Sequence, residues 1–276
     1  MAWAERGTHR IYYEVHGTGG DPTALVHGSW VDHRSWDAVV PGLAEALHVV
    51  TYDRCGHGQS PVAARPHPVA DDAADLAAVL ESANLYPAHL VAHSYGGAVA
   101  LRLATERPEL VRSVAVHEPP FFGLLRRDPA LRTEGDQVAA EVEAVKALVR
   151  RGEATEAARR FSDRIAGEPG GFDRFPPARR EAIAALAPRW AEEFDDPAAY
   201  DPDPAGLREL LLPVLLTTGD RSPGVLHRIS DVLARDVHNA RQLTLENTGH
   251  VPQRTRPELY LAVLGTFLLE RNVPST

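Results

Sequence analysis

The sequence predicts an α/β fold: a doubly wound, mostly parallel sheet with an inserted helical cap. Two observations support this prediction. Short apolar strands alternate with helical segments in the first and last parts of the chain, and residues 119–206 between them show helical segments without a strand pattern. Such alternation is typical of parallel strands joined by right-handed helical crossovers, which gather ligands at the carboxyl ends of the strands.

Periodicity and turn residues define the elements of the first part of the chain. Runs of aromatic and β-branched residues predict strands, and clusters of Gly and Pro predict the turns between them. A helix that starts at Ser94 ends before Pro108, because proline cannot continue a helix. In order, we predict a strand at 11–15, a strand at 23–26, a helix at 36–47, a strand at 49–52, a helix at 69–82, a strand at 90–91, a helix at 94–106 and a strand at 111–116.

The alternation breaks after Glu118. Helical segments follow between proline and glycine clusters, at 136–151, 153–165 and 177–193. It then resumes with a strand at 212–217, a helix at 224–235, a strand at 241–245 and a last helix at 256–270. With 276 residues the chain is long enough for one large domain with an insertion. We therefore predict a sheet domain of residues 1–118 and 207–276, and a cap or lid of residues 119–206.

Charge and composition exclude several classes of protein. The formal net charge is −9 and Lys146 is the only lysine, so nothing resembles a nucleic-acid-binding surface. No apolar stretch approaches membrane-spanning length, and the N-terminus lacks the apolar core of a signal peptide. The single cysteine, Cys55, excludes an internal disulfide framework. We expect a cytoplasmic protein with no nucleic-acid or membrane partner, and the sequence leaves a homodimer open.

Arginine pairs recur along the chain. Such pairs are typical of solvated helix faces, and contact with an anionic substrate is the less favoured alternative. They are Arg126-Arg127, Arg150-Arg151, Arg159-Arg160 and Arg179-Arg180.

Ser94 has the surroundings of a nucleophile elbow. An apolar strand ends just before it, and small residues open a helix just after it. A sharp strand-to-helix turn crowds the backbone two residues before and after the serine, which requires small side chains there. Gly96 satisfies this requirement, whereas Ala92 carries a methyl group where glycine is commoner. The helix start directs free N–H groups toward the serine, and Tyr95 supplies one of them to a developing anion.

Three further motifs accompany the Ser94 elbow in a fixed order. They are His27-Gly28 after a strand, the loop Asp53-Arg54-x-Gly56-x-Gly58-x-Ser60, and Thr248-Gly249-His250-x-Pro252 near the C-terminus. With these motifs the chain resembles the α/β-hydrolase family over nearly its whole length outside the cap. The resemblance implies that His250 is the base for Ser94, and that the Asp53 to Ser60 loop is scaffold. His93 and His117 each adjoin a key position, and we expect them to orient the backbone.

The third catalytic group departs from the usual family pattern. Family members commonly carry an acid after the strand at 212–217, where this chain has Ser222. A serine cannot stabilise an imidazolium as a carboxylate does. The resemblance to serine hydrolases with the acid after the sixth strand, such as zearalenone-type lactone hydrolases, favours Glu118, which ends the preceding strand. Asp220 is the reserve candidate, and its alternative interpretation is a turn residue paired with Arg221.

The resemblance also suggests the oxyanion hole and the substrate pocket. The backbone N–H of Ser29 is the expected second oxyanion donor beside that of Tyr95, with Trp30 as the alternate. Trp30 is also the better pocket candidate. Phe121, Phe122 and Trp190 are further pocket candidates, although for any one of them packing in the cap core is favoured.

Together these residues predict a serine hydrolase that cleaves an ester or lactone of a small organic molecule. A serine at the elbow argues against branches whose alkyl-enzyme ester requires a carboxylate nucleophile. No metal or organic cofactor is expected, because the chain shows neither an HExxH-type ligand set nor a phosphate-binding glycine loop. Thioester hydrolysis, carbon–carbon hydrolysis and cofactor-free perhydrolysis remain alternatives for the same three groups. A small-molecule receptor on the same fold is the non-enzymatic alternative.

Overall fold

Eight strands form one sheet in the computed structural model, which describes residues 2–167 and 169–269. The strand order is β1-β2-β4-β3-β5-β6-β7-β8. The pairs β1–β2 and β2–β4 are antiparallel, and the other neighbouring pairs are parallel. The strands are β1 (Ala2–Arg6), β2 (His9–His16), β3 (Pro22–Val26), β4 (His48–Tyr52), β5 (Ala88–His93), β6 (Val111–His117), β7 (Val214–Gly219) and β8 (Ala240–Leu245). The predicted fold class is confirmed.

Helices cover both faces of the sheet. The helices α2 (Val69–Ala83), α3 (Tyr95–Glu106) and α10 (Gly224–Asp236) pack on one face, and α1 (Val40–Ala44) and α12 (Pro257–Leu269) pack on the other. Along β5 the side chains alternate between the two cores, since Leu90 and Ala92 join one apolar cluster and Val91 joins the other. Burial on both faces explains why these strands are continuously apolar.

Two elements of the first part differ from the predictions. The strand β1 was not predicted; it pairs with β2 across a turn in which Gly7 has a φ of 60°. The predicted helix at 36–47 is instead a 3₁₀ turn, η1 (His33–Trp36), followed by the short helix α1. Pro41 lies in the first turn of α1, where its missing N–H is tolerated, so the helix starts there rather than running through it.

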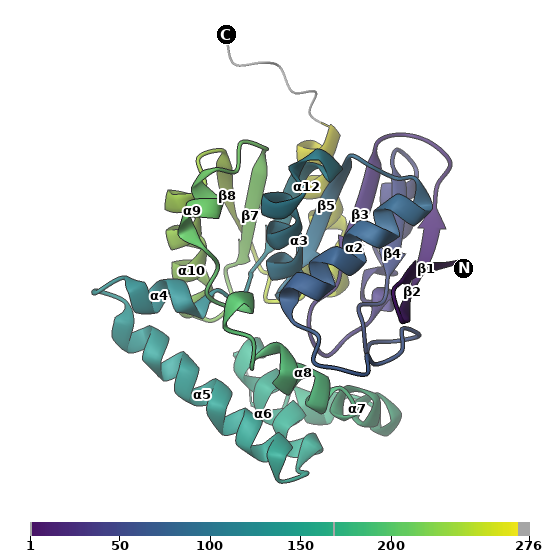
Figure 1. Ribbon diagram of the computed structural model, residues 1–276. Helices are drawn as coiled ribbons and strands as arrows, with labels where there is room; N and C mark the ends of the chain where they lie inside the picture. The colour runs from purple at the N-terminus through teal and green to yellow at the C-terminus, as the bar shows by residue number, and fades with distance from the viewer. Residues whose placement is uncertain (1, 168, 270–276) are drawn as a thin grey trace.

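The chain between β6 and β7 forms a layer of helices at one end of the sheet (Figure 1). The layer contains α4 (Phe122–Arg127), α5 (Arg132–Arg150), α6 (Ala154–Ala166), η3 (Phe172–Arg174), α7 (Pro177–Ala184) and α8 (Ala187–Glu193). The chain then returns through η4 (Pro197–Ala199) to α9 (Pro204–Arg208), which contacts α3 and α10 beside the sheet. The predicted helix at 177–193 is two helices, because Pro188 lies in the first turn of α8. The short helices α4 and α9 were not predicted, and residue 270 of the predicted last helix lies outside the described residues.

This helical layer faces the carboxyl ends of the parallel strands. It begins directly after β6, and β5, β7 and β8 lie parallel to one another and to β6. Side chains that follow these strands therefore point toward the space beneath the cap helices. None of the described helices is both long and apolar enough to cross a membrane.

Candidate active site

Ser94 occupies a strained turn between β5 and α3. Its backbone has φ 53° and ψ −124°, a conformation that a non-glycine residue rarely adopts and that costs on the order of 1–3 kcal/mol. The neighbouring backbone is close enough to require small residues, since a Cβ added to Gly96 would lie 2.3 Å from the carbonyl oxygen of Val26. A Cβ on Gly28 would lie 3.0 Å from the Cβ of Ser94. This turn holds the serine at the end of its strand, next to the cap.

Glu118 and His250 form a direct hydrogen bond. Nδ1 of His250 donates to Oε2 of Glu118 over 2.6 Å, and the backbone N–H of Gly219 donates to Oε1 over 2.8 Å. Burial raises the pKa of Glu118, but the charge of His117 and the hydrogen bond and charge of His250 outweigh burial and hold this pKa at about 2. An ionised Glu118 fixes the proton of His250 on Nδ1 and leaves Nε2 as an acceptor.

Two more histidines support the loop that carries His250. His93 donates from Nε2 to the backbone carbonyl oxygen of His250 over 2.7 Å, and their ring centroids are 4.7 Å apart. Burial, together with the charges of His250 and His117, holds the pKa of His93 well below its usual range. His117 has its pKa lowered to about 4, chiefly by burial, and its Nδ1 lies 3.0 Å from Oγ1 of Thr217. Both rings are therefore neutral near pH 7 and hold the loop by hydrogen bonds and packing.

Asp220 lies at the surface and binds the backbone of a neighbouring loop rather than the ring of His250. Its carboxylate accepts the backbone N–H groups of Asn247 and Thr248 over 2.9 and 3.0 Å, and these bonds lower its pKa. It makes none of the hydrogen bonds or ion pairs of His250 within the described residues. Asp220 therefore ties the loop after β7 to the loop that leads to His250, and Glu118 is the carboxylate that reaches the imidazole.

Ser94 and His250 line one cavity of about 610 Å³, a volume typical of small-molecule sites. The core domain contributes Ser29 and Trp30 to the wall, and the cap contributes apolar side chains that include Phe161, Ile165, Phe172, Phe175 and Ile183. The described side-chain contacts include no hydrogen bond between Ser94 and His250. Such bonds between catalytic groups often tighten only when substrate binds.

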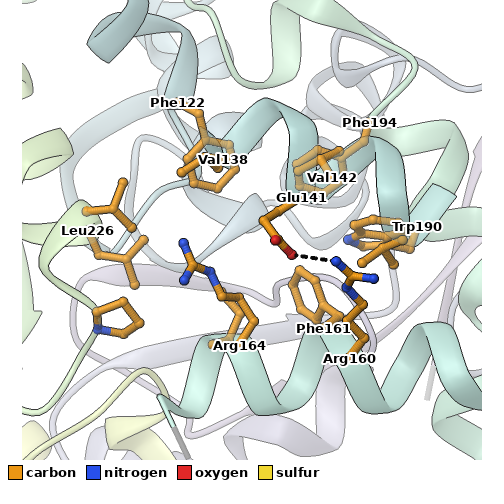
Figure 2. A pocket seen from close by; sticks show the side chains of 14 residues that line it. Phe122, Val138, Glu141, Val142, Arg160, Phe161, Arg164, Trp190, Phe194 and Leu226 are labelled. Atoms are coloured by element: carbon orange, nitrogen blue, oxygen red, sulfur yellow. Dashed lines mark hydrogen bonds and ion pairs between the residues drawn. The ribbon is translucent and has the colours of Figure 1, made fainter. Parts of the chain in front are cut away.

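The predicted pocket residues occupy two different places. Trp30 lines the cavity beside Ser94. Phe122 and Trp190 line a smaller cavity of about 50 Å³ between the cap and α10 (Figure 2), and Phe121 is buried in the main core. The ring centroids of Trp190 and Trp30 are 5.5 Å apart, so Trp190 packs against a wall residue of the larger cavity. The wall residues Phe161 and Phe175 were not found from the sequence, because nothing local distinguishes them from other cap aromatics.

A buried ionic network joins the cap to the core. The fully buried guanidinium of Arg54 pairs with Glu193 of α8 and lies 3.3 Å from Asp72. Arg189, also on α8, pairs with Asp72 over 2.8 Å. Glu193 in addition accepts the hydroxyl of Ser29. The loop with Arg54 is therefore a scaffold, as predicted from the sequence, and it connects a cap helix to the expected oxyanion residue.

Metal-donor side chains gather at two places away from the cavity. One group is His9, Cys55, His67 and Asp75, and the other is Asp32, His33 and Asp53. In the first, Asp75 accepts hydrogen bonds from His9 and His67 over 2.9 and 2.8 Å, and in the second, Asp53 accepts from His33 over 2.7 Å. Neither group includes a described residue of the wall beside Ser94. These contacts use one ring nitrogen of each histidine, and Nδ1 of His67 is buried without a hydrogen-bond partner among the described residues.

The strand order, the cap and the cavity at the strand ends define an α/β protein of the capped, doubly wound type. A model of the alpha/beta hydrolase family matches residues 24–263, and the chain belongs to this family of hydrolases.

Similar proteins include several hydrolases. RutD of Azorhizobium caulinodans, provisionally named a carbamate hydrolase, is 34% identical over 132 residues, which are 48% of this chain and 48% of RutD. The chain thus matches about half the length of this relative. The (E)-2-((N-methylformamido)methylene)succinate hydrolase of Acinetobacter baylyi is 23% identical over 87% of both chains. The solved structure of Est816, an N-acyl homoserine lactone degrading enzyme, has a TM-score of 0.75 at 21% identity, covering 96% of this chain and 100% of Est816.

Proposed function

We propose that this protein is a serine hydrolase that cleaves a carboxylic ester or lactone of a small organic molecule. Ser94 is the nucleophile, His250 the general base and Glu118 the acid that orients His250. The observation that carries the proposal is the 2.6 Å hydrogen bond from His250 Nδ1 to Glu118, made by a histidine that lines the same cavity as Ser94. This arrangement leaves His250 Nε2 free to take the proton of the serine.

The reaction proceeds through an acyl-enzyme. His250 removes the proton of Ser94 as Oγ attacks the carbonyl carbon. The tetrahedral oxyanion then accepts hydrogen bonds from the backbone N–H groups of Tyr95 and Ser29. His250 then gives the proton to the leaving alcohol. Water, deprotonated by His250, next attacks the acyl-enzyme and releases the acid and free Ser94. These steps need no metal or organic cofactor.

Tyr95 and Ser29 are held in ways that suit this role. Tyr95 is the first residue of α3, so no helical carbonyl accepts its N–H. Ser29 is anchored through its hydroxyl to Glu193. Loss of one oxyanion donor typically lowers turnover about 10²–10³-fold.

Residues 119–206 act as the lid over the reacting groups. The single cysteine, Cys55, is buried and forms no disulfide, which suits a protein of the reducing cytoplasm.

Carbamate hydrolysis is a second candidate reaction. The match to RutD favours it, although the likeness covers only half of each chain. The name of Est816 favours a lactone instead. Ser94, activated by His250 and Glu118, would attack an ester, lactone or carbamate carbonyl in the same way. The candidate reactions differ in the leaving group that His250 protonates.

A panel of p-nitrophenyl esters, lactones and aryl carbamates tests the proposal with wild type and Ser94→Ala. We expect Ser94→Ala to lower kcat by at least about 10³-fold on the preferred class. Ser82→Ala on α2 is the control and should match wild type. A fluorophosphonate probe, followed by peptide mass spectrometry, should label Ser94 in wild type and leave His250 unlabelled. Hydrolysis that persists in Ser94→Ala at the wild-type rate would overturn the mechanism.

A further inference from the structure

The cavity beside Ser94 is lined by basic residues in an acidic protein. The chain carries 38 acidic and 29 basic residues. The described wall of this cavity nevertheless contains arginines and neither Asp nor Glu; the arginines are Arg174, Arg179, Arg221 and Arg254. A wall with this excess of positive charge favours an anion inside the cavity.

Two of these arginines, Arg179 and Arg254, have no acidic partner in the described part of the chain. Arg179 lies on the cap helix α7 and is half-buried, with its guanidinium 4.2 Å from the ring centroid of Phe175. Arg254 lies on α11 (Pro252–Thr255) of the core domain, just after His250. Burial and the charge of Arg254 together lower the pKa of Arg179. The two positive groups therefore repel each other, and the described ion pairs give neither of them a carboxylate partner.

Several other arginines have polar side-chain partners. Arg54 and Arg189 have carboxylate partners at the junction of cap and core, and Arg221 donates to the side chain of Asn247 over 2.6 Å. The hollow next to the cavity, which Arg179 and Arg254 also line, contains Asp32 and Asp37. Asp32 is already bound by Arg34, and neither aspartate pairs with Arg179 or Arg254 among the described ion pairs. Among the described contacts, Arg179 and Arg254 thus have no carboxylate partner, and their N–H groups can bind a ligand.

We propose that the cavity binds a substrate that carries a carboxylate in addition to the scissile carbonyl, and that Arg179 and Arg254 hold this carboxylate. The inference rests on the proposed function and names its substrate class. A guanidinium donates two parallel hydrogen bonds to a carboxylate, and these charge-assisted bonds are about twice as strong as neutral ones. The anion also removes the repulsion between the two arginines.

The positions of the two arginines give the carboxylate a second effect. Arg179 comes from the cap and Arg254 from the core, so one anion held by both connects the two walls of the cavity. Binding of an acidic substrate then favours closure of the cap over Ser94 and His250. A neutral ester of the same length fills the apolar part of the cavity but lacks this connection.

Two esters that differ only at the end of the acyl chain test the proposal: the mono-p-nitrophenyl ester of adipate and p-nitrophenyl hexanoate. Their kcat/KM is measured with wild type, Arg179→Gln, Arg254→Gln and the double variant. The exposed Arg235→Gln, which lies outside the cavity and removes the same charge, is the control. We expect each cavity substitution to lower kcat/KM for the adipate ester about tenfold through KM, and to change the hexanoate value less than about twofold. Equal losses on both esters, or no loss on either, would overturn the anion site.

A binding measurement separates this inference from the proposed hydrolysis. Adipate and neutral 1,6-hexanediol are titrated into wild type and the double variant by calorimetry, with no reaction required. Binding of adipate alone, lost in the double variant and weakened by salt, supports the anion site even if no ester is cleaved. Ester cleavage that depends on Ser94 without adipate binding would overturn the anion site while the hydrolase assignment stands.

Discussion

The two walls of the cavity are built in different ways. On the core wall, Ser94 and Glu118 follow neighbouring parallel strands, and their backbone N–H groups donate to His117 and Thr217 on the next strand over 2.9 and 3.2 Å. On the cap wall, Phe161, Phe175 and Arg179 lie on or between short helices, which the Arg54 network joins to the core. The sheet thus fixes the reacting groups, whereas helix packing sets the shape and charge that meet the substrate. Changes in the core wall should alter kcat, and changes in the cap wall should alter KM and selectivity.

Replacement of the core-wall carboxylate gives the largest expected effect. Glu118→Gln keeps the shape of the side chain but removes the charge that stabilises a protonated His250. We expect kcat to fall about 10³–10⁴-fold, as when the acid of a Ser-His-Asp triad is replaced by its amide. Asp220→Asn, measured with the same ester, should stay within about threefold of wild type, because Asp220 contacts backbone rather than His250. If Asp220→Asn lost much more kcat than Glu118→Gln, Asp220 rather than Glu118 would be the acid that acts on His250.

The two walls also differ in what the sequence can reveal. Ser94 and His250 were found because a strand end, small neighbours and a short motif surround them. Glu118 required the family resemblance, since only the sheet order brings the end of β6 beside the loop with His250. Arg179 and Phe175 could not be separated from residues on solvated helix faces, because their direction depends on how α6, α7 and α8 pack together. Phe122 and Trp190 were considered for the pocket because they are cap aromatics, one just after Glu118 and one on the last cap helix, and packing directs them into the smaller cavity.

The connection between the walls is tested by Glu193→Gln. Arg54 has no access to solvent and would lose its main counter-charge, a change that costs about 3–5 kcal/mol of unfolding free energy when a buried pair is broken. Urea denaturation measures this loss. Turnover should also fall, because Glu193 anchors Ser29. Asp195→Asn at the end of the same helix, where an exposed carboxylate pairs with Lys146, should cost less than about 1 kcal/mol. Equal stability of the two variants would show that the buried network does not join cap to core.

Lowering the pH should reduce the free energy of unfolding by protonating Glu118. Its folded-state pKa of about 2 lies below the ordinary 4.5, so its ionised form stabilises the fold above about pH 4.5 and this stabilisation is lost as the pH falls toward 2. A shift of this size corresponds to roughly 3 kcal/mol, of which about 2 kcal/mol disappears between pH 6 and pH 3. The difference in unfolding free energy between wild type and Glu118→Gln should therefore narrow over this range. A constant difference would mean that the charge of Glu118 does not stabilise the fold.

The smallest expected effect separates charge from shape on the cap wall. Phe175→Leu keeps an apolar side chain in the cavity but removes the ring beneath the guanidinium of Arg179, a contact of 4.2 Å. A cation–π contact at a partly exposed site is worth about 0.5–1 kcal/mol, so KM for the adipate ester should rise about two- to fivefold while the hexanoate value stays nearly constant. Phe161→Leu is the matched change, because Phe161 lines the same cavity and packs on Trp30 rather than on an arginine. It should affect both esters alike. If Phe175→Leu also affects both alike, the ring contributes only apolar surface and the orientation of Arg179 depends on other contacts.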